Sequence, residues 1–156
     1  MPDAPKIEQE NQQQSIAEVQ QDLIDEFEFL DDWMDRYRHI IDLGQRLEDF
    51  PEEWMTDEFK VRGCQSQVWV VPEHKDGRIH FHATSDAAIV SGLIAIVLRI
   101  YSDRTPEEIL ATQPSFIQGV GLDEHLSPSR SNGLNSMIKV IFAHAGGDVP
   151  SDATIN

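Results

Sequence analysis

The chain has 156 residues, one cysteine, and 28 acidic against 12 basic residues, which gives a formal net charge of −16. The length predicts a single domain, and one cysteine excludes both an internal disulfide and a zinc or iron–sulfur site built from several thiolates. The acidic balance, with no basic stripe to offset it, repels phosphate backbones, so nucleic acid is not an expected partner.

The N-terminal segment, residues 1–14, is polar and rich in glutamine, and we expect it to be disordered. It has neither the basic nor the apolar region of a secretory signal. The unpaired thiol suits a reducing compartment, so the predicted location is cytoplasmic. The folded domain is predicted to span residues 15–146 and to be followed by a flexible tail at residues 147–156.

Two amphipathic helices are predicted to open the domain. Ser15 and Glu18 have the spacing of a capping box, in which each side chain satisfies the other residue's free backbone N–H. Apolar residues then follow at intervals of three and four. A second helix is expected to begin after the Asp-Asp pair at 31–32 and to weaken at Gly44.

A small sheet is predicted in the middle of the chain. Residues 67–71 and 79–83 have strand composition, and the Asp-Gly pair at 76–77 between them is a strong hairpin signal. A further short strand is expected at residues 59–61. Cys64 then lies at the tip of a first hairpin, and the sheet has three antiparallel strands.

The second half of the chain is predicted to be helical. Ser85 or Asp86 is expected to cap a helix that is apolar on nearly all sides and therefore buried. Its apolar run, residues 87–98, is shorter than the roughly 18 residues of a membrane span, so no membrane association is expected. Thr105 begins a short helix and Ser127 the last one. Helices around a small three-stranded antiparallel sheet define an α+β domain.

The setting of Cys64 differs from that of a typical core cysteine. Gly63 before it permits backbone conformations that other residues avoid, and Arg62 supplies a positive charge that favours the reactive thiolate. Three polar residues follow it: Gln65, Ser66 and Gln67. A free cysteine is most often a small buried hydrophobe, so the local pattern leaves that interpretation and a reactive thiol both open.

A cysteine hydrolase would need a base beside the thiol. His80 and His82 alternate on one predicted strand and are the candidate bases or metal ligands, although the exposed side of any half-buried strand gives the same pattern. There is no glycine-rich nucleotide loop, and no lysine has a recognisable setting for pyridoxal phosphate (PLP). This inventory favours a thiol that accepts a group and passes it on.

Three sequence blocks closely resemble the SufE family: RGCQSQVWVV at residues 62–71, SDAAIVSGLIAIVL at 85–98 and LSPSRSNGLNSMI at 126–138. A fourth match, IIDLGQRL, lies upstream, and the resemblance covers nearly the whole folded part. SufE proteins accept sulfur from a PLP-dependent cysteine desulfurase of the SufS type in iron–sulfur cluster assembly. The resemblance implies their α+β fold, which is shared with an IscU-like scaffold family that assembles clusters on several cysteines.

The resemblance also implies roles for particular residues. Cys64 matches the acceptor cysteine, which receives sulfane sulfur as a persulfide on a loop that rests against an apolar hollow and swings outward when the partner docks. Arg130 matches an arginine near this loop that contacts the partner, and Asp86 matches an acid at a helix start beside the loop. The other loop residues are expected to support the loop or to touch the partner: Arg62, Gly63, Gln65, Ser66 and Gln67.

Two of these roles have plainer alternatives. Asp86 would be a good helix cap whether or not a partner existed. Arg130 lies in the first helical turn, where the helix dipole prefers acids. A positive charge at this position is therefore slightly unfavourable, which points to a compensating salt bridge or partner contact for Arg130.

The expected function is therefore that of a sulfur carrier and not of an enzyme. The chain takes persulfide sulfur onto Cys64, raises the turnover of the desulfurase, and delivers sulfur to an iron–sulfur scaffold complex. It is expected to hold no metal and no PLP, since PLP belongs to the desulfurase. The alternatives are a CsdE-type acceptor for a paralogous desulfurase, a cysteine-dependent hydrolase that pairs Cys64 with His80 or His82, and a purely structural adaptor.

Overall fold

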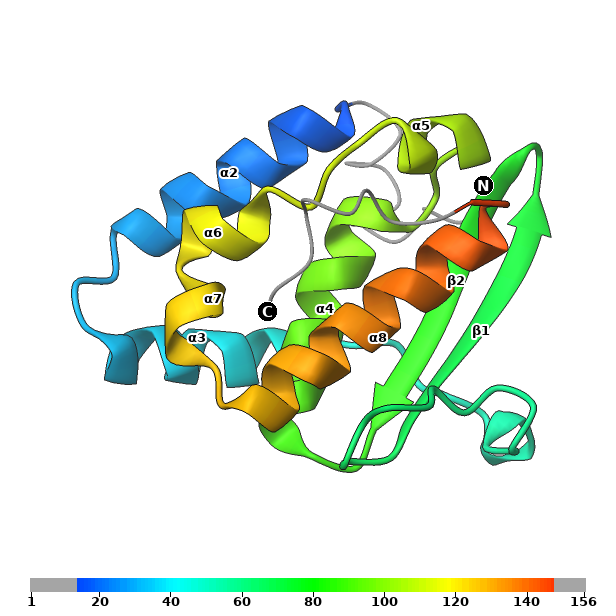
Figure 1. Cartoon of the computed structure of the whole chain (residues 1–156), viewed down its shortest axis with the longest axis horizontal. Coiled ribbons are helices and arrows are strands. Elements are labelled where there is room, and N and C mark those ends of the chain that lie inside the picture. The colour runs from blue at the N-terminus through cyan, green and yellow to red at the C-terminus, as the bar shows by residue number, and fades with distance from the viewer. Residues whose placement is uncertain (1–13, 148–156) are drawn as a thin grey trace, which may run out of the picture.

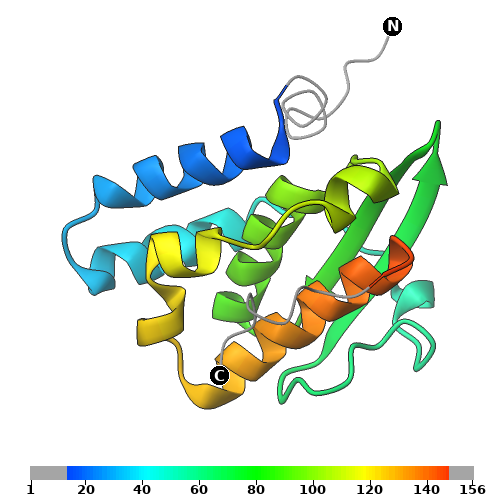
Figure 2. The same ribbon diagram turned by 45° about the horizontal axis from the view of Figure 1, so that its top comes forward.

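The computed structural model describes residues 14–147 (Figures 1 and 2). Its elements in chain order are α2 (Ile16–Glu28), α3 (Trp33–Gly44), the 3-10 helix η1 (Glu52–Trp54), β1 (Val68–Lys75), β2 (Arg78–Ser85), α4 (Ala88–Tyr101), α5 (Pro106–Leu110), α6 (Phe116–Val120), α7 (Leu122–His125) and α8 (Pro128–His144). The predictions of a disordered segment at 1–14 and a flexible tail at 147–156 lie outside the described residues, apart from Gln14 and Gly147.

The two N-terminal helices begin as predicted. The Ser15 hydroxyl accepts a hydrogen bond from the Glu18 backbone N–H, and the Glu18 carboxylate accepts one from the Ser15 N–H, which completes the capping box. The Asp32 carboxylate caps α3 by accepting a hydrogen bond of 3.0 Å from the Asp35 N–H. The apolar stripe of α2 is buried, at Ile16, Val19, Leu23 and Phe27.

The predicted hairpin is confirmed. β1 and β2 pair antiparallel from Val68 with Ser85 to Lys75 with Arg78. The two residues of the connecting turn, at 76–77, have φ angles of 53° and 78°, and a type I′ turn requires positive φ at both positions.

The predicted third strand is wrong, because the sheet formed by the described residues has two strands. Residues 59–61 do run antiparallel beside β1, since backbone hydrogen bonds of 2.8 and 3.0 Å join them to Val68 and Val70. The pairing is limited to one bridge, between Lys60 and Trp69. It ends there because the chain turns away directly after this segment. The α+β class is confirmed with a smaller sheet.

α4 is the central helix of the domain. It packs against α2, α3, α8 and β2, and Figures 1 and 2 show α8 running alongside the hairpin with α4 behind it. The burial predicted from its all-round apolar character is confirmed. α3 and α4 meet at two glycines, where a Cβ on Gly44 would lie 2.5 Å from the backbone nitrogen of Gly92.

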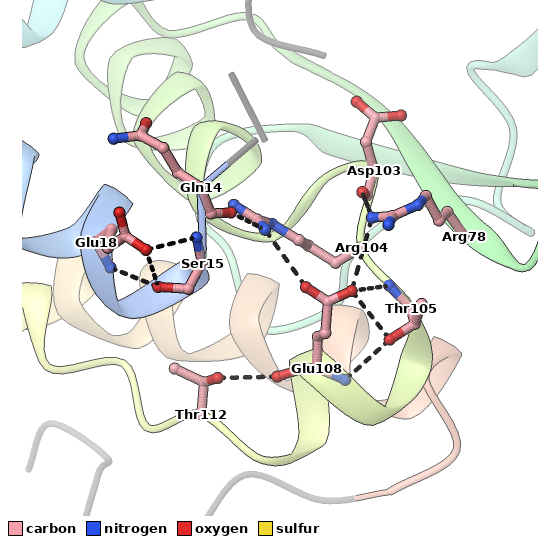
Figure 3. Close-up of polar contacts among 9 residues, drawn as sticks. All are labelled: Gln14, Ser15, Glu18, Arg78, Asp103, Arg104, Thr105, Glu108 and Thr112. Atoms are coloured by element: carbon pink, nitrogen blue, oxygen red, sulfur yellow. Dashed lines mark hydrogen bonds and ion pairs between the residues drawn. The ribbon is translucent and has the colours of Figure 1, made fainter. Parts of the chain in front are cut away.

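Arg104 joins three segments of the fold (Figure 3). Its buried guanidinium donates to the Gln14 carbonyl oxygen at the start of α2 and pairs with Glu108 of α5 at 3.3 Å. Glu108 also completes a capping box with Thr105 and forms an ion pair of 3.6 Å with Arg78. The network holds α5 against the beginnings of α2 and β2.

The last part of the chain contains one predicted helix and two unpredicted ones. α8 begins at the expected cap, where the Ser127 hydroxyl accepts a hydrogen bond from the Arg130 N–H. It ends just before Gly146, whose φ of 94° lies in the left-handed region. The short helices α6 and α7 were not predicted. Across the described residues, every helix is too short or too polar to cross a membrane.

Candidate functional site

Cys64 lies on the loop that leads into β1, and its side chain faces α8. The Sγ donates a hydrogen bond to the Gly133 carbonyl oxygen at 3.6 Å. Gly133 has no side chain, and a Cβ there would lie 3.4 Å from the sulfur, so the thiol rests directly against the helix. Cys64 is half-buried, which is neither a sealed core position nor a freely exposed one.

The thiol forms part of the wall of a surface cavity of about 360 Å³. Its lining includes apolar side chains of α4 and α8, namely Val90, Leu93, Leu134 and Met137. It also includes polar residues of the loop and of the α8 N-terminus, namely Gln65, Ser66, Ser127, Ser129 and Arg130. A reacting group could approach the sulfur through this cavity.

The loop is anchored at its end by backbone groups, whereas its middle is held, in the described part of the chain, only by side-chain contacts. The Asp86 carboxylate accepts a hydrogen bond of 3.0 Å from the Gln67 N–H, and the Asp86 N–H donates to the Gln67 carbonyl at 3.3 Å. Residues 62–66 make no backbone–backbone hydrogen bond with any described residue. Gly63 has φ of 90°, and a Cβ there would lie 2.6 Å from the Ser136 hydroxyl, so only glycine fits.

The predicted capping role of Asp86 is wrong. α4 has Ala87 at its cap position with no side-chain cap hydrogen bond. The Ser85 hydroxyl accepts from the Ala87 N–H at 3.2 Å. The Asp86 carboxylate is used instead by the loop, because the Gln67 N–H offers it a partner 19 residues away.

The two arginines of the predicted site are placed differently. Arg130 lines the cavity with an exposed side chain, and within residues 14–147 nothing forms a hydrogen bond or ion pair with its guanidinium. The salt-bridge alternative therefore has no counterpart in the described structure. Arg62 is exposed and does not line the cavity.

The histidines proposed for a hydrolase lie elsewhere. His80 and His82 line a second cavity, which shares no lining residue with the first. Each imidazole is hydrogen-bonded to a carboxylate, Asp103 for His80 and Glu73 for His82. Neither histidine is therefore placed to act as a base for Cys64, and the hydrolase alternative gains no support.

Burial sets the protonation of the thiol. Removal from water disfavours the charged thiolate and raises the pKa of Cys64 above its usual value. The expectation that Arg62 would favour the thiolate is not met in this conformation. The resting thiol is therefore protonated and weakly nucleophilic near neutral pH.

We expect the folded chain to be alkylated at Cys64 by iodoacetamide more slowly than the urea-unfolded chain at pH 7–8. A raised pKa lowers the thiolate fraction, so the midpoint of the rate against pH should lie above that of the unfolded chain. Alkylation followed by mass spectrometry across a pH series measures both midpoints. Coincident midpoints would show that the thiol is not desolvated in the folded state.

The sequence interpretation missed the contact between Cys64 and Gly133. The two residues are 69 positions apart, and no local pattern reports such a pairing. Once Ser127 is taken as the helix cap, helical spacing places Arg130, Gly133 and Met137 along one side of α8. That spacing could have grouped these residues on one side of the helix, but the sequence does not show that this side faces the Cys64 loop.

Comparison with known proteins identifies the family. The family described as SufE, an Fe–S metabolism associated domain, matches residues 21–145. The chain belongs to the SufE family. The matched range contains the loop, the cavity and α4 of this SufE-family chain, so the resemblance of the three sequence blocks is confirmed.

Curated relatives of this SufE protein cover most of its length. An uncharacterised SufE-like protein of Rhizobium meliloti (strain 1021) is 48% identical over 134 residues, which are 83% of this chain and 96% of the relative. An uncharacterised SufE-like protein of Rhizobium etli is 50% identical over 129 residues, 79% of this chain and 86% of the relative. Both matches extend over nearly all of the relatives' own length.

A solved structure shares the fold. The solution structure of a hypothetical protein from Thermus thermophilus matches with a TM-score of 0.67 over 81% of this chain and 93% of that chain, at 19% sequence identity. At that identity the likeness concerns the fold alone.

Proposed function

We propose that this protein accepts sulfur from a PLP-dependent cysteine desulfurase of the SufS type as a persulfide on Cys64, and delivers it to an iron–sulfur scaffold complex. The observation that carries the proposal is the position of the thiol. The chain's one sulfhydryl rests half-buried in a cavity wall, on a loop with no backbone hydrogen bonds across residues 62–66. Family membership supports the same assignment.

The transfer is an exchange between sulfur atoms. The Cys64 thiolate attacks the terminal sulfur of the desulfurase persulfide and forms a new S–S bond. The S–S bond within the donor breaks, and the desulfurase thiolate leaves with its electron pair. The proton released from the Cys64 thiol balances the leaving thiolate through solvent, and no external oxidant is consumed.

Burial at rest serves this chemistry. A permanently exposed thiolate would be oxidised to sulfenic and higher acids. In the resting state, burial raises the pKa of Cys64 and so keeps the thiol protonated, and the contact with Gly133 partly covers the sulfur. Docking of the donor turns residues 62–66 outward, and we assign the hinge to Gly63 because glycine, which has φ of 90° here, can adopt a wide range of backbone angles. The thiol then enters water beside Arg62 and Arg130, where the thiolate is favoured.

The remaining residues position the loop. Asp86 holds the loop's end through Gln67, so that the outward movement is confined to residues 62–66. Gln65 and Ser66 line the cavity and meet the incoming donor segment. Removal of the persulfide from the desulfurase frees that enzyme for the next cycle, which raises its turnover. The proposed setting is the cytoplasm, and PLP is held by the desulfurase alone.

Mass spectrometry tests the proposal directly. The full chain is incubated with a SufS-type desulfurase, PLP and cysteine without reductant, and its intact mass and peptide map are taken. We expect the mass of one sulfur atom to be added on the peptide that contains Cys64. The same reaction with a CsdE-type desulfurase establishes which enzyme is the better donor. A chain that gains no sulfur from either donor, or gains it away from Cys64, refutes the proposal.

A further inference from the structure

A second group of reactive side chains lies between the hairpin and the segment that follows α3. His80 and His82 of β2 both face Glu48. The Glu48 carboxylate oxygens lie 3.5 Å from His80 Nε2 and 3.7 Å from His82 Nδ1. One ligand atom from each of the three residues lies within 4.8 Å of the other two. The group lines a cavity of about 450 Å³ that is separate from the cavity of Cys64.

Two further carboxylates orient the imidazoles. His80 Nδ1 donates to the Asp103 carboxylate at 2.8 Å, and His82 Nε2 donates to the Glu73 carboxylate at 2.7 Å. The other nitrogen of each ring is thereby left facing Glu48. Asp103 is 4% exposed, and its backbone carbonyl, not its carboxylate, accepts from Arg78 (Figure 3). A carboxylate behind each ligating histidine is the usual outer shell of a protein metal site.

The three side chains lie close enough together to close around a small metal ion. A tetrahedral ion with bonds of about 2.1 Å holds its ligand atoms about 3.4 Å apart. Glu48 Oε1 lies 3.5 Å from His80 Nε2 and Glu48 Oε2 lies 3.7 Å from His82 Nδ1. One atom from each of the three residues lies within 4.8 Å of the other two, so a small inward movement of Glu48 would bring them to this spacing. Glu48 is 52% exposed at its side chain, so it can adjust without disturbing the core. Two imidazoles and one carboxylate form a ligand set used for zinc, with the fourth position open to water.

An ion-pair network is the alternative explanation of the same contacts. Hydrogen bonding to Asp103 is the main cause that raises the pKa of His80 to about 9, so without a metal this ring carries a proton. A protonated ring can hold Glu48 by charge alone. The two explanations differ in one measurable respect, because an ion-pair network takes up no metal.

We propose that Glu48, His80 and His82 bind one divalent transition-metal ion of the zinc class, with Asp103 and Glu73 orienting the two imidazoles. This revises the expectation of a chain without a metal site. The bound ion ties the segment after α3 to β2 and leaves one coordination position facing the cavity. The site does not depend on the sulfur-transfer proposal, because it shares no residue with the Cys64 cavity.

Calorimetric titration of the full chain with zinc sulfate tests the site. A Cys64→Ser background removes the thiol, which is itself a zinc ligand. We expect one ion per chain and a rise in melting temperature with zinc, because the ion binds only the folded state. Glu48→Gln and His82→Gln should each weaken binding by about 100-fold or more, and Asp103→Asn by about 10- to 100-fold. His74→Gln, an exposed histidine of β1, is the matched control and should bind as the parent does.

Several results would overturn the proposal. Zinc binding that is present with Cys64 and absent in Cys64→Ser would assign the ion to the thiol. Binding that survives Glu48→Gln and His82→Gln unchanged would place it elsewhere, and no saturable binding at all would leave an ion-pair network only. Circular dichroism of each variant establishes that it is folded, and Glu48→Gln, which alters an exposed side chain, keeps the test valid if His82→Gln fails to fold.

Discussion

Replacement of Cys64 by serine is expected to abolish the stimulation of desulfurase turnover. A serine hydroxyl remains protonated at neutral pH and cannot attack a persulfide sulfur, so the donor is left with its sulfur in place. The fold should survive, because Cys64 is half-buried and a serine hydroxyl can still donate to the Gly133 carbonyl. The rate of alanine release by the desulfurase, measured with excess added chain, should fall to that of the enzyme alone.

A relocated thiol provides the matched control for this prediction. Ser115 is exposed, lies outside the Cys64 cavity, and makes no side-chain cap hydrogen bond. The double variant Cys64→Ser with Ser115→Cys keeps one thiol per chain and should give no stimulation. Stimulation by the double variant would show that any exposed thiol suffices. Stimulation by Cys64→Ser alone would show that the chain acts on the desulfurase without accepting sulfur.

The elements that were predicted correctly have signals within a few residues. The Ser15–Glu18 capping box, the turn at 76–77 and the Ser127 cap each satisfy local backbone groups, and each begins or connects an element where expected. Such contacts form whatever the rest of the chain does, so their sequence pattern is sufficient. α6 and α7 have no comparable signal, because helices of five and four residues are too short to display a period.

The incorrect predictions concern residues whose expected local interaction is replaced by an interaction with a part of the chain that is distant in sequence. Asp86 has the sequence position of a helix cap, but the Gln67 N–H takes its carboxylate. Residues 59–61 have strand character and do contact β1, but the turn that carries Cys64 begins too soon for a ladder. In both places the loop of the thiol overrides a local preference. The sequence pattern was enough to select Cys64 as the candidate acceptor, whereas its contact with Gly133 required the fold.

Gly92→Ala is expected to destabilise the protein strongly. A Cβ at this position would lie 2.6 Å from the carbonyl carbon of Ile40 and closer still to its oxygen. That neighbour is the backbone of α3, which cannot move aside without separating the two helices. Overpacking of this kind costs about 3 kcal/mol, offset by about 1 kcal/mol from the better helix propensity of alanine. Urea unfolding should therefore show a net loss of roughly 2 kcal/mol at unchanged slope.

Gly119→Ala separates backbone collision from the general effect of adding a methyl group. A Cβ on Gly119 would also meet a close neighbour, Ile24, with the side-chain Cγ1 at 2.6 Å. Here the neighbour is a partly exposed side chain of α2 and not backbone. Isoleucine is stiff at χ1 in a helix, but this side chain can shift toward solvent, so we expect a smaller loss than for Gly92→Ala, of about 1 kcal/mol. Equal losses in the two variants would contradict the argument, because the close approach of α3 and α4 would then have no special cost. A stable Gly92→Ala variant would mean that the helix holding the cavity's Val90 and Leu93 is less firmly fixed than its packing indicates.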